Sequence, residues 1–350
     1  MGQIQPKRSG FFRRWGLALA AAVTALTVWL SARKLDIGAL RKAFGQADYF
    51  LIGAAAVISV LAILIVSLRW RLLLRPGGIV NLGKVFRITV VSQYINIVTP
   101  GRFGEPAKAI LVARGAPFPP AFALGTVAVE KALDFFIFLA LWTLALALFP
   151  LRGAVREYTV AVILGGFLAA ALVVFAWKPK PVLRAVRWAM HFLPAKFRRG
   201  GGDFAEKGVE AFQVLRDLRT VPALAALTLL VLAGEILPNW LLLRAFGLDV
   251  PFWAALFVLI VLQVGKLPPS LPGKIGVYQY AVILALAPFG VGRDEALGYS
   301  IMLHAVTFIP RIVLGMVFAA GLGAAAWRTQ TGAEKTVNAP GGAEERGDEK

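Results

Sequence analysis

The sequence predicts an all-α polytopic membrane protein, with about six full transmembrane helices plus two re-entrant helical hairpins arranged as an inverted repeat. Of its 350 residues 58% are hydrophobic and only 16% are charged, and the mean hydropathy is +0.72. This is too apolar for a soluble globular domain of this length. Several uncharged runs are long enough to cross a bilayer. A helix-breaking motif, proline-glycine followed by a cation, also occurs twice inside apolar sequence, at Pro100–Gly104 and Pro272–Gly276.

The predicted membrane region comprises residues 15–327, after a basic cytoplasmic N-terminal segment, 1–14. Its six predicted spans are 15–31, 49–68, 121–149, 158–177, 221–243 and 296–327. We interpret the first as a retained signal anchor rather than a cleaved signal peptide, because it is long for the apolar region of such a peptide and further spans follow. The second ends at Arg69-Trp70-Arg71, a sequence typical of an anchor at the cytoplasmic interface.

Two further apolar segments, 84–114 and 251–290, are interrupted by the proline-glycine phrases. The arms beside each interruption are too short to span a bilayer, so each segment is predicted to be a re-entrant hairpin. Residues 178–220 hold ten Lys or Arg and four Asp or Glu among apolar residues, which is typical of amphipathic helices on the cytoplasmic leaflet. Residues 328–350 have no apolar run, and we expect a disordered tail.

The distribution of cations predicts the orientation. Segments 1–14, 69–87 and 178–220 hold 19 Lys or Arg, whereas the predicted outer loops hold eight. Because cations collect in cytoplasmic loops, both termini are predicted to be cytoplasmic, in a plasma membrane of the bacterial type. The cations behind the formal net charge of +19 are therefore expected to contact anionic lipid head groups, and no nucleic-acid partner is expected.

Cysteine and histidine are too scarce for several kinds of chemistry. The chain has no cysteine and only two histidines, His191 and His304. A disulfide framework, a thiolate metal site and a thiol nucleophile are excluded, and we expect no metal site and no cofactor. We interpret His304, in an apolar span, as a hydrogen-bonded core residue rather than a proton carrier.

The likeness between the two halves extends beyond the repeated phrase. The run Arg69–Arg75 (RWRLLLR) matches Asn239–Arg244 (NWLLLR), and the tryptophan precedes the proline by 30 residues in one half and 32 in the other. Repeat one (15–150) and repeat two (158–327) each contain three predicted spans. An odd number of spans inverts the second copy relative to the first. Chance recurrence of leucine-rich phrases is the alternative explanation.

The two breaks are the predicted binding sites. A helix that restarts after a break presents unpaired N–H groups and the positive end of its dipole, which beside Arg102 or Lys274 predicts a site for an anion such as phosphate. The candidate substrate-binding residues are Asn96, Thr99, Gly101, Arg102, Gly104 and Glu105 at the first break and Gly273, Lys274 and Gly276 at the second. Alternatively, Arg102 pairs with Glu105, and Lys274 extends to a membrane interface.

Five charged residues inside predicted spans are candidates for ion coupling or ion pairing: Glu130, Lys131, Asp134, Glu235 and Arg311. Glu130 and Asp134 are four residues apart and share a helix face, where two carboxylates need a cation, water or a proton. Arg102 and Lys131 are the candidate cations. The sequence leaves open whether the carboxylates form a structural pair or relay protons, and whether Glu235 pairs with Arg311.

These motifs resemble a known family, the transmembrane region of lysylphosphatidylglycerol synthases and its stand-alone, flippase-like relatives, over most of residues 15–327. The likeness lies in residues 96–105, 130–134 and 272–277 and in the span that ends near Pro310 and Gly315. The family usually shows Glu-Arg where this chain has Glu130-Lys131. The resemblance implies a lipid-handling membrane domain, which in the bifunctional synthases moves aminoacylated phosphatidylglycerol between leaflets. The separate soluble aminoacyltransferase domain is not expected here, so the synthase activity is not carried over.

Three functions compete. The first is translocation, or flipping, of a polar, phosphate-bearing lipid between leaflets by alternating access of two inverted repeats. The second is a membrane-embedded lipid or glycolipid transferase, with Glu105, Glu130 or Asp134 as general base. The third is an accessory scaffold of a cell-envelope lipid pathway. The inverted repeat favours the first, so an enzyme is not expected; membrane lipids are the predicted partners and lipid-synthesis enzymes the candidate protein partners, with the oligomeric state left open.

Overall fold

The computed structural model describes residues 22–31, 36–99, 103–148, 166, 206–217, 219–265 and 271–337. Every regular element in these ranges is helical, which confirms the predicted all-α class. Several predictions lie outside the described residues: the N-terminal segment 1–14, the span 158–177 apart from residue 166, most of the amphipathic segment 178–220, and Gly101 and Arg102 at the first break.

The first half of the chain consists of two long helices separated by a pair of shorter ones. After a helix at Ala22–Ser31 come α2 (Ile37–Gly45), α3 (Tyr49–Leu74), η1 (Arg75–Gly77), α4 (Leu82–Val98), α5 (Gly104–Ala113) and α6 (Pro120–Leu148). Side chains cap two of these helices at the N-terminus. Asp48 accepts a hydrogen bond from the backbone N–H of Phe50 at 2.9 Å, and Asn81 accepts one from Gly83 at 2.8 Å. α4 and α5 are the two arms of the first predicted hairpin.

The second half repeats this order of long and short helices. Its elements are residues 206–210, η2 (Ala211–Arg216), α10 (Thr220–Ala245), α11 (Phe252–Gly265), η3 (Pro272–Lys274), α12 (Val277–Leu286), η4 (Ala287–Phe289) and α13 (Arg293–Val337). α11 and α12 are the arms of the second predicted hairpin. The four main helices of this half therefore correspond in order to α3, α4, α5 and α6.

Helix length separates crossing helices from hairpin arms. Three helices of the described chain are long and apolar enough to cross a membrane: Tyr49–Gly77, Thr220–Ala245 and Arg293–Gly321. α6 has 29 residues and is about 44 Å long. In contrast, α5 and α12 have ten residues each, which is about 15 Å and half of the hydrocarbon thickness. These lengths support the re-entrant interpretation of both hairpins.

Two helix ends lie beyond their predicted positions. α3 continues to Leu74, past the expected end at Leu68, because Arg69 and Trp70 are buried among neighbouring helices and do not mark an interface. α13 continues to Val337, where a disordered tail was expected from residue 328. No proline follows Pro310 within α13 to end the helix.

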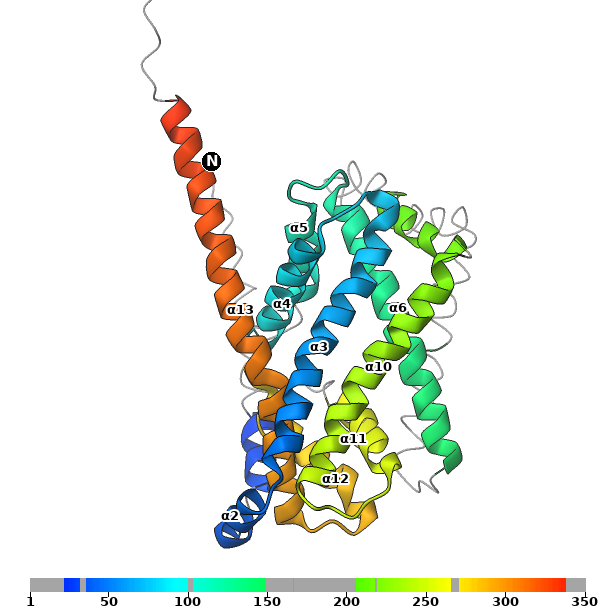
Figure 1. Ribbon diagram of the computed structural model, residues 1–350, viewed down its shortest axis with the longest axis vertical. Helices are drawn as coiled ribbons and strands as arrows, with labels where there is room; N and C mark the ends of the chain where they lie inside the picture. Colours follow the sequence, from blue (N-terminus) through cyan, green and yellow to red (C-terminus); the bar gives the residue numbers. More distant parts are fainter. Residues whose placement is uncertain are drawn as a thin grey trace, which may run out of the picture.

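The two halves are arranged in opposite directions around α3 and α10 (Figure 1). These two helices pack along each other and run antiparallel, with α4 and α5 beside the upper end of the pair and α11 and α12 beside the lower end. The helices approach closely where Gly234 of α10 meets Ala62 of α3, since a Cβ added at Gly234 would lie 2.7 Å from the Ala62 Cβ. The break of the second hairpin, η3, reaches α4 of the first. Both observations support the predicted inverted repeat.

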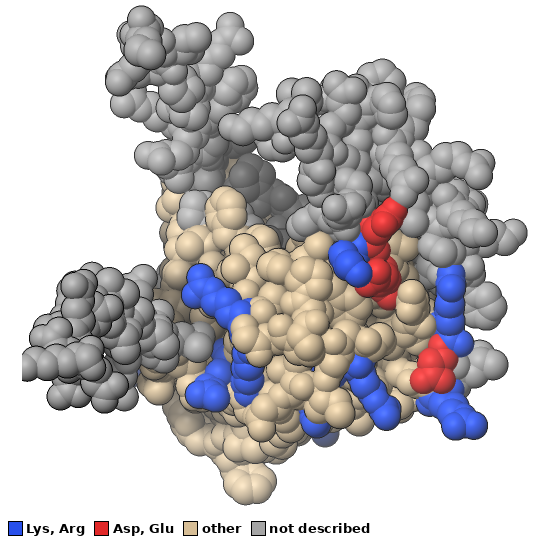
Figure 2. Space-filling model, turned by 90° about the horizontal axis from the view of Figure 1, so that it is seen from above, with Lys and Arg blue, Asp and Glu red and all other residues tan. Residues whose placement is uncertain are grey.

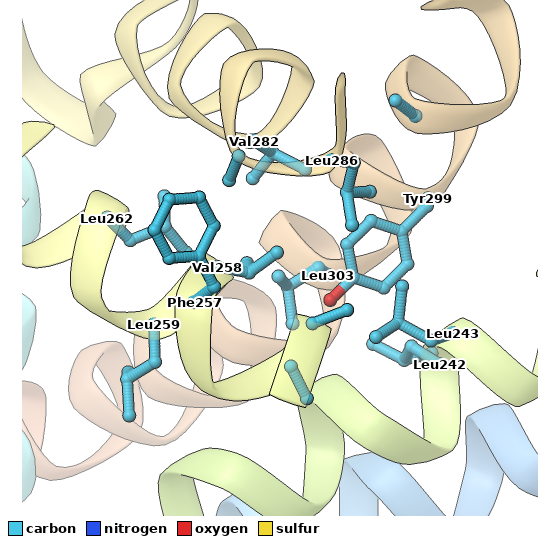
Figure 3. Packing of buried hydrophobic residues seen from close by; sticks show 14 of the residues in the cluster. Leu242, Leu243, Phe257, Val258, Leu259, Leu262, Val282, Leu286, Tyr299 and Leu303 are labelled. Atoms are coloured by element: carbon cyan, nitrogen blue, oxygen red, sulfur yellow. The ribbon is translucent and has the colours of Figure 1, made fainter. Parts of the chain in front are cut away.

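The described helices are packed around two hydrophobic clusters, one formed mainly by the second half and one mainly by the first, and each includes a few residues of the other half. In the second half, Leu242 and Leu243 of α10 pack against α11, α12 and α13, where Tyr299 and Leu303 are fully buried (Figure 3). In the first half, Trp70 of α3 is the largest fully buried side chain of a separate cluster with α4, α5, α6 and η2. Each cluster thus packs one hairpin against long helices of the bundle.

The two ends of the helix bundle differ in charge. The end beside α4 and α5 carries mostly Lys and Arg, with a few acidic residues (Figure 2). Its exposed cations include Arg75, Arg87, Arg114, Arg216 and Arg219, and its acidic residues are Glu206, Glu210 and Asp217. At the opposite end, acids equal or exceed cations in the described loops and first turns: Asp36, Asp48, Asp249, Asp294 and Glu295 with Arg41, Lys42, Arg244 and Arg293. This asymmetry supports the prediction that the α4–α5 end faces the cytoplasm.

Candidate functional site

A cavity of about 190 Å³ lies between helices of both repeats. Its walls come from α3, α4, α5 and α6 of the first half and from α10 and α11 of the second. The charged residues that line it are Arg69, Glu105, Lys108, Glu130, Lys131, Asp134 and Glu235. Neutral polar side chains also line it: Thr89, Ser92, Gln93, Thr228 and Gln263. A concave site on which charged and polar side chains converge from several helices is a candidate ligand site.

Glu130 of α6 is the centre of a buried ion network. One of its carboxylate oxygens lies 2.7 Å from Lys108 Nζ, and the other lies 3.5 Å from Arg69 Nη2. The same Arg69 nitrogen donates to Asp134 Oδ1 at 2.6 Å. The side chains of Glu130, Lys108 and Arg69 are at most 3% exposed. The network therefore joins α3, α5 and α6 in an interior where an unpaired charge is costly.

Lys131 extends this network towards the open side of the cavity. Its Nζ lies 3.1 Å from Glu105 Oε1 on α5 and 3.5 Å from Asp134 Oδ2 on its own helix. The Lys131 side chain is 42% exposed, so its pairs are weaker than those of Glu130. Glu105, predicted as a substrate-binding residue, thus lies in the cavity and is held by Lys131.

Of the two cations expected beside the carboxylates, Lys131 contacts Asp134 and Arg102 lies outside the described residues. The sequence interpretation missed the two closest partners, Arg69 and Lys108. Arg69 was assigned to the interface and is instead 1% exposed, because its helix continues past it and turns it towards α6. Its neighbour Trp70 donates to Thr126 Oγ1 at 3.0 Å.

Lys108 is a site residue that sequence reasoning missed. It lies in the apolar arm α5, 2% exposed, with Nζ 4.0 Å from the centre of the Trp70 ring. The sequence did contain a sign of this role. Lys108 follows Glu105 by three residues, so it lies on the same helix face as a residue already predicted at the site.

Three donors at the cavity have no hydrogen-bond partner among the described residues. These are Nε and Nη1 of Arg69 and Oγ1 of Thr89, each fully buried. Arg69 and Thr89 are both 1% exposed and both line the cavity. Buried polar atoms are nearly always paired, and a guanidinium can only donate. The arrangement therefore offers a place for an oxygen acceptor of a ligand.

At the first break, the predicted residues on either side of 100–102 hold the hairpin together. Asn96 Oδ1 accepts from the backbone N–H of Gly104 at 2.8 Å, and its amide nitrogen lies 3.5 Å from Glu105 Oε1. Thr99 Oγ1 donates to the carbonyl of Ile95 at 2.6 Å. The first backbone N–H of α5, which was expected to bind an anion, therefore already donates to Asn96.

At the second break, the backbone turns through three residues with positive φ, Gly273 (77°), Lys274 (55°) and Gly276 (84°). The Gly276 N–H donates to Gln279 Oε1 at 2.7 Å, and Gln279 Nε2 lies 3.0 Å from His304 Nδ1. The His304 ring also packs on Tyr278, with ring centres 4.6 Å apart. This contact pattern agrees with the interpretation of His304 as a hydrogen-bonded core residue.

The Ala22–Ser31 helix covers this second break. Thr24 Oγ1 accepts from the backbone N–H of Leu271 at 3.1 Å. A Cβ at Gly276 would lie 2.6 Å from the Val28 side chain, so only glycine allows this approach. Lys274, Gly273 and Gly276 do not line the cavity described above.

Arg311 connects the two repeats from outside the cavity wall. Its Nε donates to Gln93 Oε1 of α4 at 3.0 Å, and its Nη1 donates to the carbonyl of Thr307. Glu235 lies in the cavity wall, and the two residues form no direct ion pair. The side-chain partner of Arg311 in the described chain is thus Gln93, and the pairing of Glu235 with Arg311 stays a prediction.

Fold and site together define a class of protein: a polytopic α-helical membrane protein with two opposed helical hairpins and a charged cavity between its halves. Its sequence matches the family described as the lysylphosphatidylglycerol synthase TM region over residues 16–315, and the chain belongs to this family.

Three relatives of this chain come from archaea. A UPF0104 membrane protein of Methanothermobacter thermautotrophicus is 26% identical over 335 residues, which cover 86% of this chain and 91% of the relative. A UPF0104 membrane protein of Methanocaldococcus jannaschii is 22% identical, with 75% and 82% covered. Glycosyltransferase AglD of Haloferax volcanii is 25% identical over 344 residues, covering 87% of this chain and 54% of AglD. The chain thus spans about half the length of AglD.

Proposed function

We propose that this protein translocates a polar lipid between the two leaflets, with the lipid head group held in the cavity between the repeats. The observation that carries the proposal is the set of buried donors of Arg69 and Thr89 at a cavity whose walls come from both repeats. A phosphoryl or hydroxyl oxygen of a head group can accept from them. Because one repeat forms each side of the cavity, rocking of the two repeats would change the side to which it opens.

The charge of the cavity limits the class of lipid. The described lining holds three cations, Arg69, Lys108 and Lys131, and four carboxylates, Glu105, Glu130, Asp134 and Glu235. Such a lining repels a multiply charged anion and suits a head group that is neutral and polar or carries both signs. The anion site predicted at Arg102 stays a prediction.

A membrane-embedded transferase is the second candidate, favoured by the relative named glycosyltransferase AglD. Its general base would be one of the cavity carboxylates. However, Glu130 lies within 3.5 Å of two cations, and Glu105 lies 3.1 Å from Lys131. A carboxylate held in this way is a poor proton acceptor, so these contacts argue against Glu105 and Glu130 as the general base.

The test is lipid exchange in liposomes that contain the purified protein. Phosphatidylglycerol, phosphatidylethanolamine and a glycosylated lipid, each with a fluorescent label, are followed with an impermeant quencher, and new lipid products are scored in parallel. We expect exchange above protein-free liposomes for at least one lipid, without a new product. Product without exchange would support the transferase, and the absence of both for all three lipids would contradict the proposal.

Thr89→Val separates ligand binding from stability in this assay. The change keeps the shape of the side chain and removes a hydroxyl that has no partner in the described chain, so the free energy of unfolding should stay the same or rise. Loss of one hydrogen bond of about 1.4 kcal/mol should slow exchange about tenfold at low lipid concentration. Glu295→Gln, at an exposed position on the first turn of α13, is the control.

A further inference from the structure

Glu235 differs from the other three carboxylates of the cavity. Those three each lie within 3.1 Å of a cation, in the pairs Glu105–Lys131, Glu130–Lys108 and Asp134–Arg69. Glu235 lines the same cavity and is exposed to it. Its carboxylate forms no ion pair or hydrogen bond with the part of the chain that the structure describes. It is therefore the carboxylate whose charge can change without breaking a salt bridge.

The helix around Glu235 is weakened at the same place. Pro238 lies inside α10 and has no N–H, so the carbonyl of Gly234 lacks its usual donor four residues on. The Asn239 side chain instead donates to the carbonyl of Glu235 at 2.6 Å. A proline with a side-chain hydrogen bond of this kind is a common site of helix bending. Gly234 is also where α10 approaches Ala62 of α3 in the other repeat.

Charged and titratable groups face Glu235 from several helices. Arg311 of α13 and Tyr278 of α12 lie within range of its charge. The remaining titratable groups of the cavity are Arg69 on α3, Glu105 and Lys108 on α5, and Glu130, Lys131 and Asp134 on α6. The lining residues of α4 and α11 are uncharged. The cavity cations Arg69, Lys108 and Lys131 are each paired with another carboxylate. Among these charged groups, Arg311 is the cation near Glu235 that no other carboxylate pairs with in the described chain.

We propose that Glu235 is the proton-binding site of this protein, beside Pro238 in α10, and that its protonation couples lipid movement to a proton gradient. A coupling carboxylate must be reachable by water, free of a tight cation and located on an element that can move. Glu235 has the first two properties, and Pro238 gives α10 a point at which it can bend. One proton would bind Glu235 from one side of the membrane and leave to the other side with each lipid moved. The coupling rests on the proposed function, whereas proton binding by Glu235 does not.

The coupling is tested by exchange in liposomes with and without an imposed pH gradient. We expect the gradient to accelerate exchange by the wild-type protein, and Glu235→Gln to lose the whole of this increment. Glu235→Asp, which keeps a carboxylate, should retain part of it, and Glu295→Gln should respond as the wild type does. A gradient response that survives in Glu235→Gln, or wild-type exchange that ignores the gradient, would overturn the proposal.

Proton binding is tested separately by infrared difference spectroscopy of the detergent-solubilised protein. Acidification should raise a carbonyl stretching band of a protonated carboxylic acid in the wild type and in Glu295→Gln, with a component missing in Glu235→Gln. Identical spectra for the wild type and Glu235→Gln would overturn the assignment of the proton site. If this component is present but no lipid exchanges under any condition, the proposed translocation and its coupling fail while the proton site stands.

Discussion

Replacing Glu130 with glutamine is expected to lower the free energy of unfolding by about 3 to 5 kcal/mol. Glu130 and its partner Lys108 are each 3% exposed and 2.7 Å apart. The neutral amide would leave Lys108 buried without a counter-ion and would remove one of the two carboxylates beside Arg69. Reversible unfolding in mixed detergent micelles, followed by circular dichroism, measures the loss.

A double variant distinguishes an ion pair from a simple packing defect. Glu130→Met combined with Lys108→Met removes both charges with similar volumes, and much of the lost stability should return. Glu295→Gln should change the free energy of unfolding by about 0.5 kcal/mol or less. Full stability of Glu130→Gln together with loss of pH-driven exchange would contradict the structural role and make Glu130, not Glu235, the proton carrier.

Gly104→Ala is expected to lower the free energy of unfolding by about 3 kcal/mol, which is at the upper end for volume added to a packed interior. A Cβ at this position would lie 2.0 Å from the carbonyl oxygen of Ser92 and 2.7 Å from Asn96 Oδ1. The first contact is with backbone, so α4 and α5 must move apart, and the hydrogen bond from Ser92 Oγ to the Gly104 carbonyl at 2.9 Å would be strained. The same unfolding measurement applies.

Gly53→Ala is the matched control for this glycine substitution. Gly53 lies inside α3 with open space around its Cβ position, and alanine is the better helix former by about 1 kcal/mol. The free energy of unfolding of this control should therefore equal that of the wild type or be somewhat higher. If Gly104→Ala were as stable as Gly53→Ala, the close contact of the first hairpin would not exist in the folded protein.

The fold was predictable because its signals are local. Apolar runs and proline-glycine breaks gave α4 and α5, α6, α10, and α11 and α12 close to their observed bounds, since a membrane helix is fixed by length and hydropathy. The end of α3 was missed for a non-local reason. An Arg-Trp-Arg sequence is typical of an interface, and only the packing of α5 and α6 against Arg69 and Trp70 makes this one part of the interior.

The candidate site was predictable only in part. Glu130, Asp134, Lys131 and Glu105 were expected at a polar site, and the structure places them in one cavity. Their pairing partners depend on how three helices are rotated about their axes, which one sequence does not specify. Thr89 gave no signal at all, because a single threonine in an apolar helix is common and its significance lies in a hydroxyl without a partner.

The most direct test of the central claim is access to the cavity from each side of the membrane. Val231→Cys places a thiol on the cavity wall of α10, and Gln46→Cys places one on the exposed loop before α3; the chain has no other cysteine. An impermeant thiol reagent should reach position 231 from both sides, and its attachment should stop lipid exchange, whereas position 46 should react from one side with exchange unchanged. Labelling of position 231 from neither side, or exchange that continues after it is labelled, would contradict translocation through this cavity.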